Sequence, residues 1–295
     1  MKRVLTGLLI LLASISVVAI AAFAAHHYLS FPLDWKVICL ILVAVSILYL
    51  LLWLGSWLLF VASNGSKQIT MSAETEEVTI NICGVGRITI DWGDGTSSSL
   101  KYFYMPFFAD THKYRFSHSY NDETSTDSKR SYTITIEGRY INSLDASNNK
   151  LTDLDVSNIP ELTVLDCSEN ELKSVDVSHN KALKELDCSN NRLESLNVTK
   201  NRRLRYLLCD ENEITSLNTS KNGSLKRLDC SCNQLTGLDL TKNSSLTELL
   251  CMSNPIETLN VNKNVILRLL MCFDTLLTRL DVSKNSKLTD LIFVE

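Results

Sequence analysis

Residues 162–182 read LTVLDCSENELKSVDVSHNKA, and residues 183–203 read LKELDCSNNRLESLNVTKNRR. Leucine, cysteine and asparagine return at the same places after 21 residues, and this spacing continues to the end of the chain. A fixed period of this length predicts a solenoid in which each repeat forms one coil. The two leucine columns are Leu162, Leu183, Leu204, Leu225, Leu246, Leu267, Leu288 and Leu165, Leu186, Leu207, Leu228, Leu249, Leu270, Leu291.

The repeat unit, LxxLDCSxNxLxxLDVSxNxx, predicts a mainly β fold. Its LxxLxC part is expected to be a strand with leucine and cysteine turned inward. One coil cannot bury this apolar side, so successive coils stack at about 4.8 Å around a shared core. Residues 141–295 therefore hold seven full coils and a final strand. The half-repeat LxxLDVSxN is expected to build the opposite wall in the same way, with inward Val156, Val177, Val198, Leu240, Val261 and Val282.

Six of the nine cysteines share one position of the repeat. A disulfide framework would place cysteines in irregularly spaced pairs, and a zinc site would show CxxC pairs with nearby histidines. We therefore expect free thiols in the core, a common place for unpaired cysteine. The six are Cys167, Cys188, Cys209, Cys230, Cys251 and Cys272, while Cys39, Cys83 and Cys232 lie outside the pattern.

Asparagine occupies two more positions of the repeat. Inside a bend, its side chain can hydrogen-bond backbone groups of the neighbouring coil that the curved chain leaves unpaired. Taken together, the repeats resemble the leucine-rich repeats of bacterial cell-surface proteins. The resemblance covers half of the chain and implies an extracytoplasmic position. The columns are Asn149, Asn170, Asn191, Asn212, Asn233, Asn254 and Asn180, Asn201, Asn222, Asn243, Asn264, Asn285.

Two outward positions flank the inward leucine–cysteine pair of each strand, on the face expected to be concave. Early coils carry polar residues there, such as Asp166 and Ser168, whereas the last coils carry large apolar ones. Soluble surfaces seldom keep such a patch without a partner. The sequence therefore predicts a protein-binding patch formed by Tyr206, Leu208, Leu250, Met252, Leu269, Met271, Phe273 and Ile292.

Two other interpretations of the last coils stay open. Their apolar residues could meet a cap or the end of the solenoid, or an open carboxy-terminal strand could pair with a second copy in an assembly. A column of lysines is expected to be solvated and to keep the stack soluble. It consists of Lys200, Lys221, Lys242, Lys263 and Lys284.

Residues 64–140 precede the repeats and show a different pattern. Segments 77–82, 87–91 and 131–136 alternate apolar and polar residues, as strands with one buried face do. Glycine accepts a positive φ, so the sequence WGDG at 92–95 predicts a hairpin. We expect a small antiparallel β sandwich that serves as a spacer.

Three motifs of this segment resemble the polycystic-kidney-disease type of immunoglobulin-like domain. They are DWGDGT at 91–96, HSY at 118–120 and YTITI at 132–136, and the resemblance implies that the first two are structural. The aromatic-rich stretch 100–113 departs from it. Asp91 and Asp94 are expected to cap the turn, because a calcium site needs about six oxygen ligands and the sequence names two.

Residues 1–63 are expected to form two transmembrane helices, at 4–29 and 37–62. Both segments lack Asp, Glu, Lys and Arg, and each exceeds the roughly 20 residues needed to cross a bilayer core. A signal peptide cleaved near Ala24 is an alternative for the first segment. Lys2 and Arg3 favour a cytoplasmic amino terminus, and two spans would then return the repeats to the cytoplasm. That side conflicts with the extracytoplasmic position that the resemblance implies.

The sequence offers no basis for catalysis or for a cofactor or metal. None of the five histidines has a Cys, Ser or Asp at catalytic or metal-ligand spacing. The net charge of −4 and the lack of a long Lys/Arg run disfavour nucleic acid. The chain is therefore predicted to be a non-enzymatic, membrane-anchored receptor or adhesin-like protein that binds another protein.

Overall fold

The computed structural model describes residues 67–101, 113–120 and 130–293 of the 295-residue chain. These residues form strands and turns, and none of them lies in a helix. Within these ranges there is accordingly no helix that could span a membrane. The predicted transmembrane segments 4–29 and 37–62 lie outside the described residues, as does most of the stretch 100–113.

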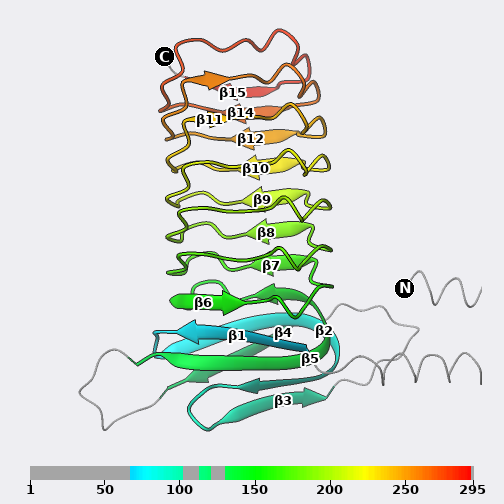
Figure 1. Cartoon of the computed structure of the whole chain (residues 1–295), viewed down its shortest axis with the longest axis vertical. Helices are drawn as coiled ribbons and strands as arrows, with labels where there is room; N and C mark the ends of the chain where they lie inside the picture. The colour runs from blue at the N-terminus through cyan, green and yellow to red at the C-terminus, as the bar shows by residue number, and fades with distance from the viewer. Residues whose placement is uncertain (1–66, 102–112, 121–129, 294–295) are drawn as a thin grey trace, which may run out of the picture. The chain divides into compact units, whose positions relative to one another are not determined.

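Six strands precede β7 and pair antiparallel with one another (Figure 1). The strand β1 lies between β5 and β6, while β2 pairs with β3, β4 and β5. Their inward isoleucines, such as Ile69 and Ile80, are fully buried, as the alternating pattern predicts. The strands are β1 (Lys67–Ala73), β2 (Glu77–Asp91), β3 (Ser97–Lys101), β4 (Lys113–Ser119), β5 (Tyr132–Asp145) and β6 (Leu151–Asp155).

A single strand, β2, contains both segments 77–82 and 87–91, for which the sequence predicts two strands. Its pairing with β5 shifts register between Cys83 and Gly84 and again before Ile88. A Cβ on Gly84 would lie 2.6 Å from the carbonyl oxygen of Tyr140, so this close approach requires glycine. The bulge lets one strand pair with β4 in its first half and with β3 in its second half.

The strand β5 joins the upstream strands to the repeats without a linker. Its residues 143–145 pair parallel with β7, whereas its earlier residues pair antiparallel with β1. Asn149 of the first coil accepts a hydrogen bond from the Thr79 N–H (2.7 Å) and donates one to the Thr79 carbonyl (2.8 Å). The predicted boundary at residue 140 thus falls inside a strand. The two-layer sandwich stays a prediction, because these strands all belong to one hydrogen-bonded sheet.

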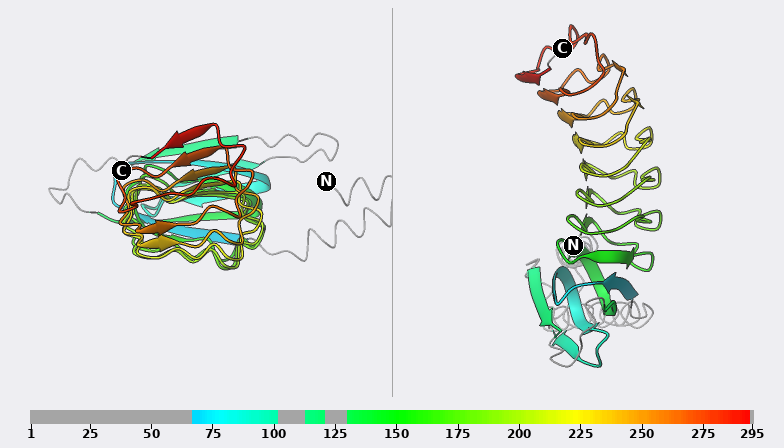
Figure 2. Two further views of the ribbon diagram at one scale, coloured as in Figure 1. Left: turned by 90° about the horizontal axis from the view of Figure 1, so that it is seen from above. Right: turned by 90° about the vertical axis from the view of Figure 1, so that its left-hand side faces the viewer.

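Seven parallel three-residue strands follow β6 at 21-residue intervals and stack in one column (Figures 1 and 2). Together with residues 143–145 they confirm the predicted seven coils and final strand. They are β7 (Val164–Asp166), β8 (Glu185–Asp187), β9 (Tyr206–Leu208), β10 (Arg227–Asp229), β12 (Glu248–Leu250), β14 (Leu269–Met271) and β15 (Asp290–Ile292).

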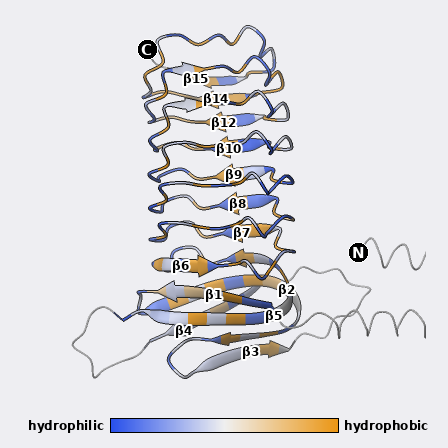
Figure 3. Ribbon diagram, in the orientation of Figure 1, coloured by the Kyte–Doolittle hydropathy of each residue, from blue (hydrophilic) through white to orange (hydrophobic). Residues whose placement is uncertain are grey.

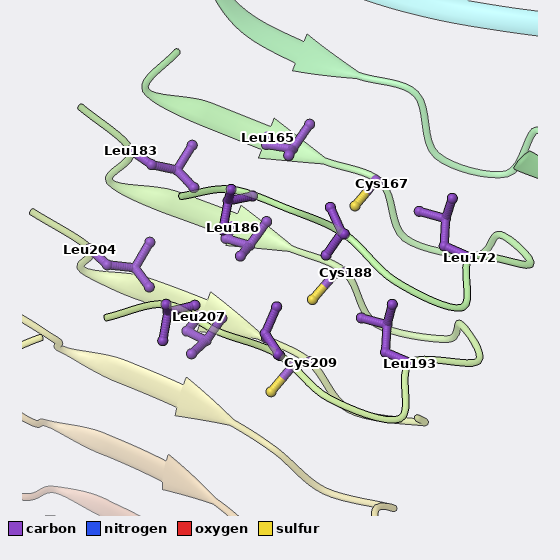
Figure 4. Packing of buried hydrophobic residues seen from close by; sticks show 14 of the residues in the cluster. Leu165, Cys167, Leu172, Leu183, Leu186, Cys188, Leu193, Leu204, Leu207 and Cys209 are labelled. Atoms are coloured by element: carbon purple, nitrogen blue, oxygen red, sulfur yellow. The ribbon is translucent and has the colours of Figure 1, made fainter. Parts of the chain in front are cut away.

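Leucine and cysteine ladders fill the interior, as predicted (Figure 4). The six column cysteines are fully buried and free. Several of them, such as Cys167 and Cys209, also donate a weak hydrogen bond to a carbonyl oxygen of the next coil, at 3.4 Å. Burial raises the pKa of these thiols, so they stay protonated near neutral pH.

The first asparagine column bonds the neighbouring coil, also as predicted. The Asn191 carbonyl accepts from the Leu172 N–H (3.0 Å), and its amide donates to the Cys167 carbonyl of the preceding coil (2.9 Å). The residue before each asparagine, and Asp274 before Thr275 in the last such turn, is left-handed with φ between 50° and 55°, and none is glycine. This left-handed column consists of Asn148, Glu169, Asn190, Glu211, Cys232, Ser253 and Asp274.

The opposite wall differs from the prediction. Its apolar side chains point inward, and Val156, Val177 and Val198 are fully buried. Backbone pairing there is sparse in the described part of the chain: β11 (Gly237–Leu238) pairs with β13 (Thr258–Leu259), and one bridge joins Leu196 to Leu217. This wall therefore packs as the strand wall does but does not form a continuous sheet.

Candidate binding surface

The outward side of β7 to β10, β12, β14 and β15, here called the strand face, carries regular columns of side chains. Parallel pairing sets equivalent residues of adjacent coils side by side. One column follows the inward leucine of each strand, and a second lies two residues further on. The first is Asp145, Asp166, Asp187, Leu208, Asp229, Leu250, Met271 and Ile292; the second is Ser147, Ser168, Ser189, Asp210, Ser231, Met252 and Phe273.

In four coils these two columns form a closed turn between aspartate and serine. The Asp187 carboxylate accepts from the Ser189 N–H (3.1 Å) and from the Ser189 hydroxyl (2.6 Å). The pairs that start at Asp145, Asp166 and Asp229 repeat this pattern. A side-chain carboxylate that binds the backbone two residues on stabilises such a turn. Aspartate and serine therefore have a structural role on the strand face.

Three coils replace this turn with other residues. Leu208 with Asp210, Leu250 with Met252, and Met271 with Phe273 cannot make the two hydrogen bonds. The backbone nevertheless pairs in the same register, and the thiols of these coils stay fully buried. Because the four coils with aspartate and serine fold in the same register, the fold does not require apolar residues at these positions. Each of the three coils without this pair lacks the two hydrogen bonds of the turn, which are worth about 1 kcal/mol apiece.

Six of the eight predicted patch residues gather at the last coils. Leu250, Met271 and Ile292 follow one another in register, and Leu269 lies beside them on β14. Figure 3 shows β8 with hydrophilic ends, whereas the second half of β12 is hydrophobic. We call this group the apolar ladder: Leu250, Met252, Leu269, Met271, Phe273 and Ile292.

Exposure varies along the apolar ladder. Ile292 is 43% exposed, and Met252, Met271 and Phe273 are half-buried. Leu250 is 8% exposed yet does not belong to the core cluster. The ladder thus combines accessible side chains with one buried on the strand face.

The other two predicted residues stand apart from the apolar ladder. Tyr206 is 38% exposed and pairs with Glu185 and Arg227. Leu208 lies between Asp187 and Asp229 in its column. The coil of β10 therefore separates these two residues from the ladder, and the single patch predicted from the sequence is divided.

The separating coil is strongly polar. Arg227 forms salt bridges to Glu248 (3.1 Å) and to Asp229 (3.7 Å). Burial, and then repulsion from Asp229, raises the pKa of Asp210 to about 6. These groups bound the apolar ladder on the side of the earlier coils.

Leu276 extends the apolar surface beyond the predicted residues. It is 57% exposed and borders a shallow hollow of 290 Å³ that Pro255 and Thr275 also line. Earlier coils place a charged or polar residue at its position, such as Glu171, Arg192 or Gln234, and the adjacent coil places Pro255 there. The change to leucine in this column is visible in the sequence, but it lies outside the strand positions from which the patch was predicted.

The motifs that resemble the polycystic-kidney-disease type meet in one cluster. The Tyr120 hydroxyl donates to the Trp92 carbonyl (2.8 Å), and the His118 ring stacks on Trp92 at 4.9 Å. Asp91 and Asp94 cap the turn by accepting from the N–H groups of Gly93 (3.0 Å) and Thr96 (2.9 Å), as predicted.

The carboxylate of Asp94 is engaged by neighbours within the turn, Thr96 and His118. Its hydrogen bonds to Thr96, followed by the contact with His118, lower its pKa to about 2. Among the described residues no group of His, Cys, Asp and Glu is arranged to hold a metal ion.

No family model matches the chain, and no curated protein does either. The domain resemblance of the upstream segment therefore stays a prediction.

Solved structures of bacterial leucine-rich-repeat proteins do match the chain. The functional domain of InlJ from Listeria monocytogenes, which includes a cysteine ladder, is 29% identical over 53% of this chain and 46% of that chain, with a TM-score of 0.41. The internalin InlF of the same species is 26% identical over 50% and 48%, with a TM-score of 0.47. A leucine-rich-repeat protein of Leptospira interrogans is 25% identical over 51% and 42%, with a TM-score of 0.48. The matches span less than half the length of each of these chains.

Proposed function

We propose that the chain is a non-catalytic leucine-rich-repeat module that binds another protein through the apolar ladder. The observation that carries this proposal is the loss of the Asp–Ser turn in the coils of Leu250 and Met271. Other coils of the same stack fold with aspartate and serine at these positions, so folding does not require apolar residues there. Binding to a partner accounts for the apolar residues of the last coils. Interface centres are depleted in charge and rich in aromatic residues and methionine, which describes Met252, Met271 and Phe273.

Phe273 is the proposed anchor of the interface. Aromatic residues dominate the binding energy at protein interfaces, and methionine adapts to more than one partner surface. Both columns of the strand face are apolar in the coils of β12 and β14, so Met252 and Phe273 lie in adjacent coils beside Leu250 and Met271.

The experiment uses two double variants. The ladder variant carries Phe273→Asp and Met252→Asp, and the matched control carries Thr258→Asp and Thr278→Asp on the opposite wall. Both pairs add the same charge at accessible positions. Partners that the full-length protein retains are identified by mass spectrometry, and their affinities are measured. We expect the ladder variant to lose binding and the control to keep it, with both melting near the parent. A folded ladder variant that retains every partner contradicts the proposal.

A second candidate function is self-assembly through β15. In the described residues β15 pairs with β14 alone, and Leu291 is 43% exposed, whereas its column mates such as Leu270 are buried. An open strand edge can pair with another copy. Sedimentation of the parent distinguishes the two candidates, because self-assembly predicts an oligomer whose mass depends on protein concentration.

We also propose that segments 4–29 and 37–62 anchor the protein in a membrane, with the repeats on the extracytoplasmic side. Their length and lack of charge support the anchor. The protein should stay with membranes in high salt and require detergent for release, because salt weakens only electrostatic attachment. Protease added to intact cells should remove the residues beyond 66. Release by salt alone, or protection from protease, contradicts the corresponding half of the proposal.

A further inference from the structure

From residue 179 on, the turns that lead into the strand face form an edge on which every charged residue is a lysine or an arginine. We call it the basic edge: residues 179–184, 200–205, 221–226, 242–247, 263–268 and 284–289. All of its cations are exposed. They are Lys181, Lys184, Lys200, Arg202, Arg203, Arg205, Lys221, Lys226, Lys242, Lys263, Arg268, Lys284 and Lys287.

The segments that leave the strand face have the opposite charge. Between residues 169 and 281 this acidic edge contains Lys173, Arg192 and Arg279 as its cations. Arg192 is paired with Glu171 at 3.0 Å. Its acids are Glu169, Glu171, Asp176, Glu194, Glu211, Glu213, Asp239, Glu257, Asp274 and Asp281. The small net charge of −4 therefore conceals a separation of charge across the solenoid.

Backbone hydrogen bonds stack three cations of the basic edge directly on one another. The Arg205 N–H donates to the Lys184 carbonyl (2.7 Å), and the Lys226 N–H donates to the Arg205 carbonyl (2.8 Å). Like charges in adjacent strands destabilise a sheet. None of the three forms a salt bridge within the described part of the chain. No salt bridge within the described residues therefore offsets their mutual repulsion.

Other coils place threonine at this position. The hydroxyls of Thr163 and Thr247 each donate to a carbonyl of the preceding coil at 2.9 Å, and Thr289 does so at 3.2 Å. The repeat can thus use this position to bond the next coil. Three coils instead have a cation at this position, Lys184, Arg205 or Lys226, and so lose that hydrogen bond and gain mutual repulsion. This indicates that the three cations bind a negatively charged ligand.

We propose that the basic edge binds a linear anionic polysaccharide that lies along the stack of coils. The cations recur with each coil, about every 4.8 Å, and so follow the line of an extended chain. The segments of the basic edge contain no Phe, Tyr or Trp, and single-stranded nucleic acid needs such side chains to stack its bases. The acidic edge repels the same polymer and thereby confines it to one side. The basic edge borders the apolar ladder but shares no residue with it, so the inference goes beyond the proposed function.

The test removes three charges from one edge or the other. The basic-edge variant carries Lys184→Thr, Arg205→Thr and Lys226→Thr, and the control carries Lys173→Thr, Arg192→Thr and Arg279→Thr. Both change the net charge equally. The probe is a heparin-derived oligosaccharide, and its affinity for the full-length protein is measured at two salt concentrations. We expect binding that weakens as salt rises, at least tenfold weaker binding by the basic-edge variant, and less than a twofold change in the control.

Stability gives an independent readout. The basic-edge variant is expected to melt at or above the parent, because threonine restores the hydrogen bond used in other coils and removes the repulsion. A single variant, Arg205→Gln, is expected to bind about threefold more weakly and covers the case in which the triple variant does not fold. The proposal is overturned by no binding to the parent, by equal losses in both triple variants, or by tighter binding of an equally charged thymidine oligonucleotide.

Discussion

At the scale of single residues, Thr219 occupies a position at which other coils have valine or leucine, and its hydroxyl completes the hydrogen bonding of one asparagine. Its hydroxyl donates to the side-chain carbonyl of Asn243 at 2.9 Å. The equivalent carbonyl oxygens of the other asparagines in that column are buried without a partner: Asn180, Asn201, Asn222, Asn264 and Asn285. One hydroxyl therefore satisfies an acceptor that the repeat otherwise leaves unsatisfied.

The substitution Thr219→Val should destabilise the protein by about 1–3 kcal/mol, because it leaves the Asn243 oxygen buried and unpaired. The reverse change in the preceding coil, Val198→Thr, should cost less than about 1 kcal/mol, since its hydroxyl can reach Asn222. Urea denaturation of the two variants measures both values. Equal destabilisation by the two changes would argue against this role for the hydroxyl.

At the scale of an element, the turn after each strand requires one left-handed residue, and the sequence does not always supply a suitable one. Asn148 and Asn190 suit this conformation, whereas Glu211 and Cys232 hold φ of 51° and 52° despite a Cβ that disfavours it. The column tolerates them because backbone bonds on both sides fix the turn, such as Glu211 N–H to the Ser231 carbonyl at 3.0 Å.

Replacing a poorly suited member of this column should therefore stabilise its turn. We expect Cys232→Asn and Glu211→Asn each to stabilise the fold by up to about 1 kcal/mol. The control Asn190→Ala should lower stability by a similar amount. Thermal melts of the three variants test the expectation, and a stabilising Asn190→Ala would contradict it.

At the scale of the whole molecule, the upstream strands and the coils share one sheet. The upstream strands thus cover the first coil, a position that solenoids need to have capped. Asn149→Ala removes both hydrogen bonds to Thr79 and should destabilise residues 67–293 as one cooperative unit. Calorimetry should show one transition for the parent and a lower one for the variant. Two separate transitions in the parent would support the independent domains expected from the sequence.

The sequence predicts those features that repeat or that depend on short-range chemistry. The period of 21 residues placed the strands, the thiol ladder and the asparagine bonds, and Asp91 and Asp94 were recognised as turn caps. Features that depend on distant neighbours were missed. The bulge at Gly84 follows from the approach of Tyr140, and the polar coil between Leu208 and Leu250 divides the patch only once the strands are paired.

The central claim is that the apolar ladder binds a partner and is not needed for the stability of the coils. The most direct measurement is the melting temperature of the double variant Leu250→Asp/Met252→Ser, which introduces the Asp–Ser turn that Asp229 and Ser231 form in the preceding coil. We predict a melting temperature equal to or above that of the parent, together with loss of the partners that the parent retains. A fall of more than about 5 °C, which corresponds to roughly 1–2 kcal/mol for a unit of this size, would show that these residues hold the coil together and would contradict the account.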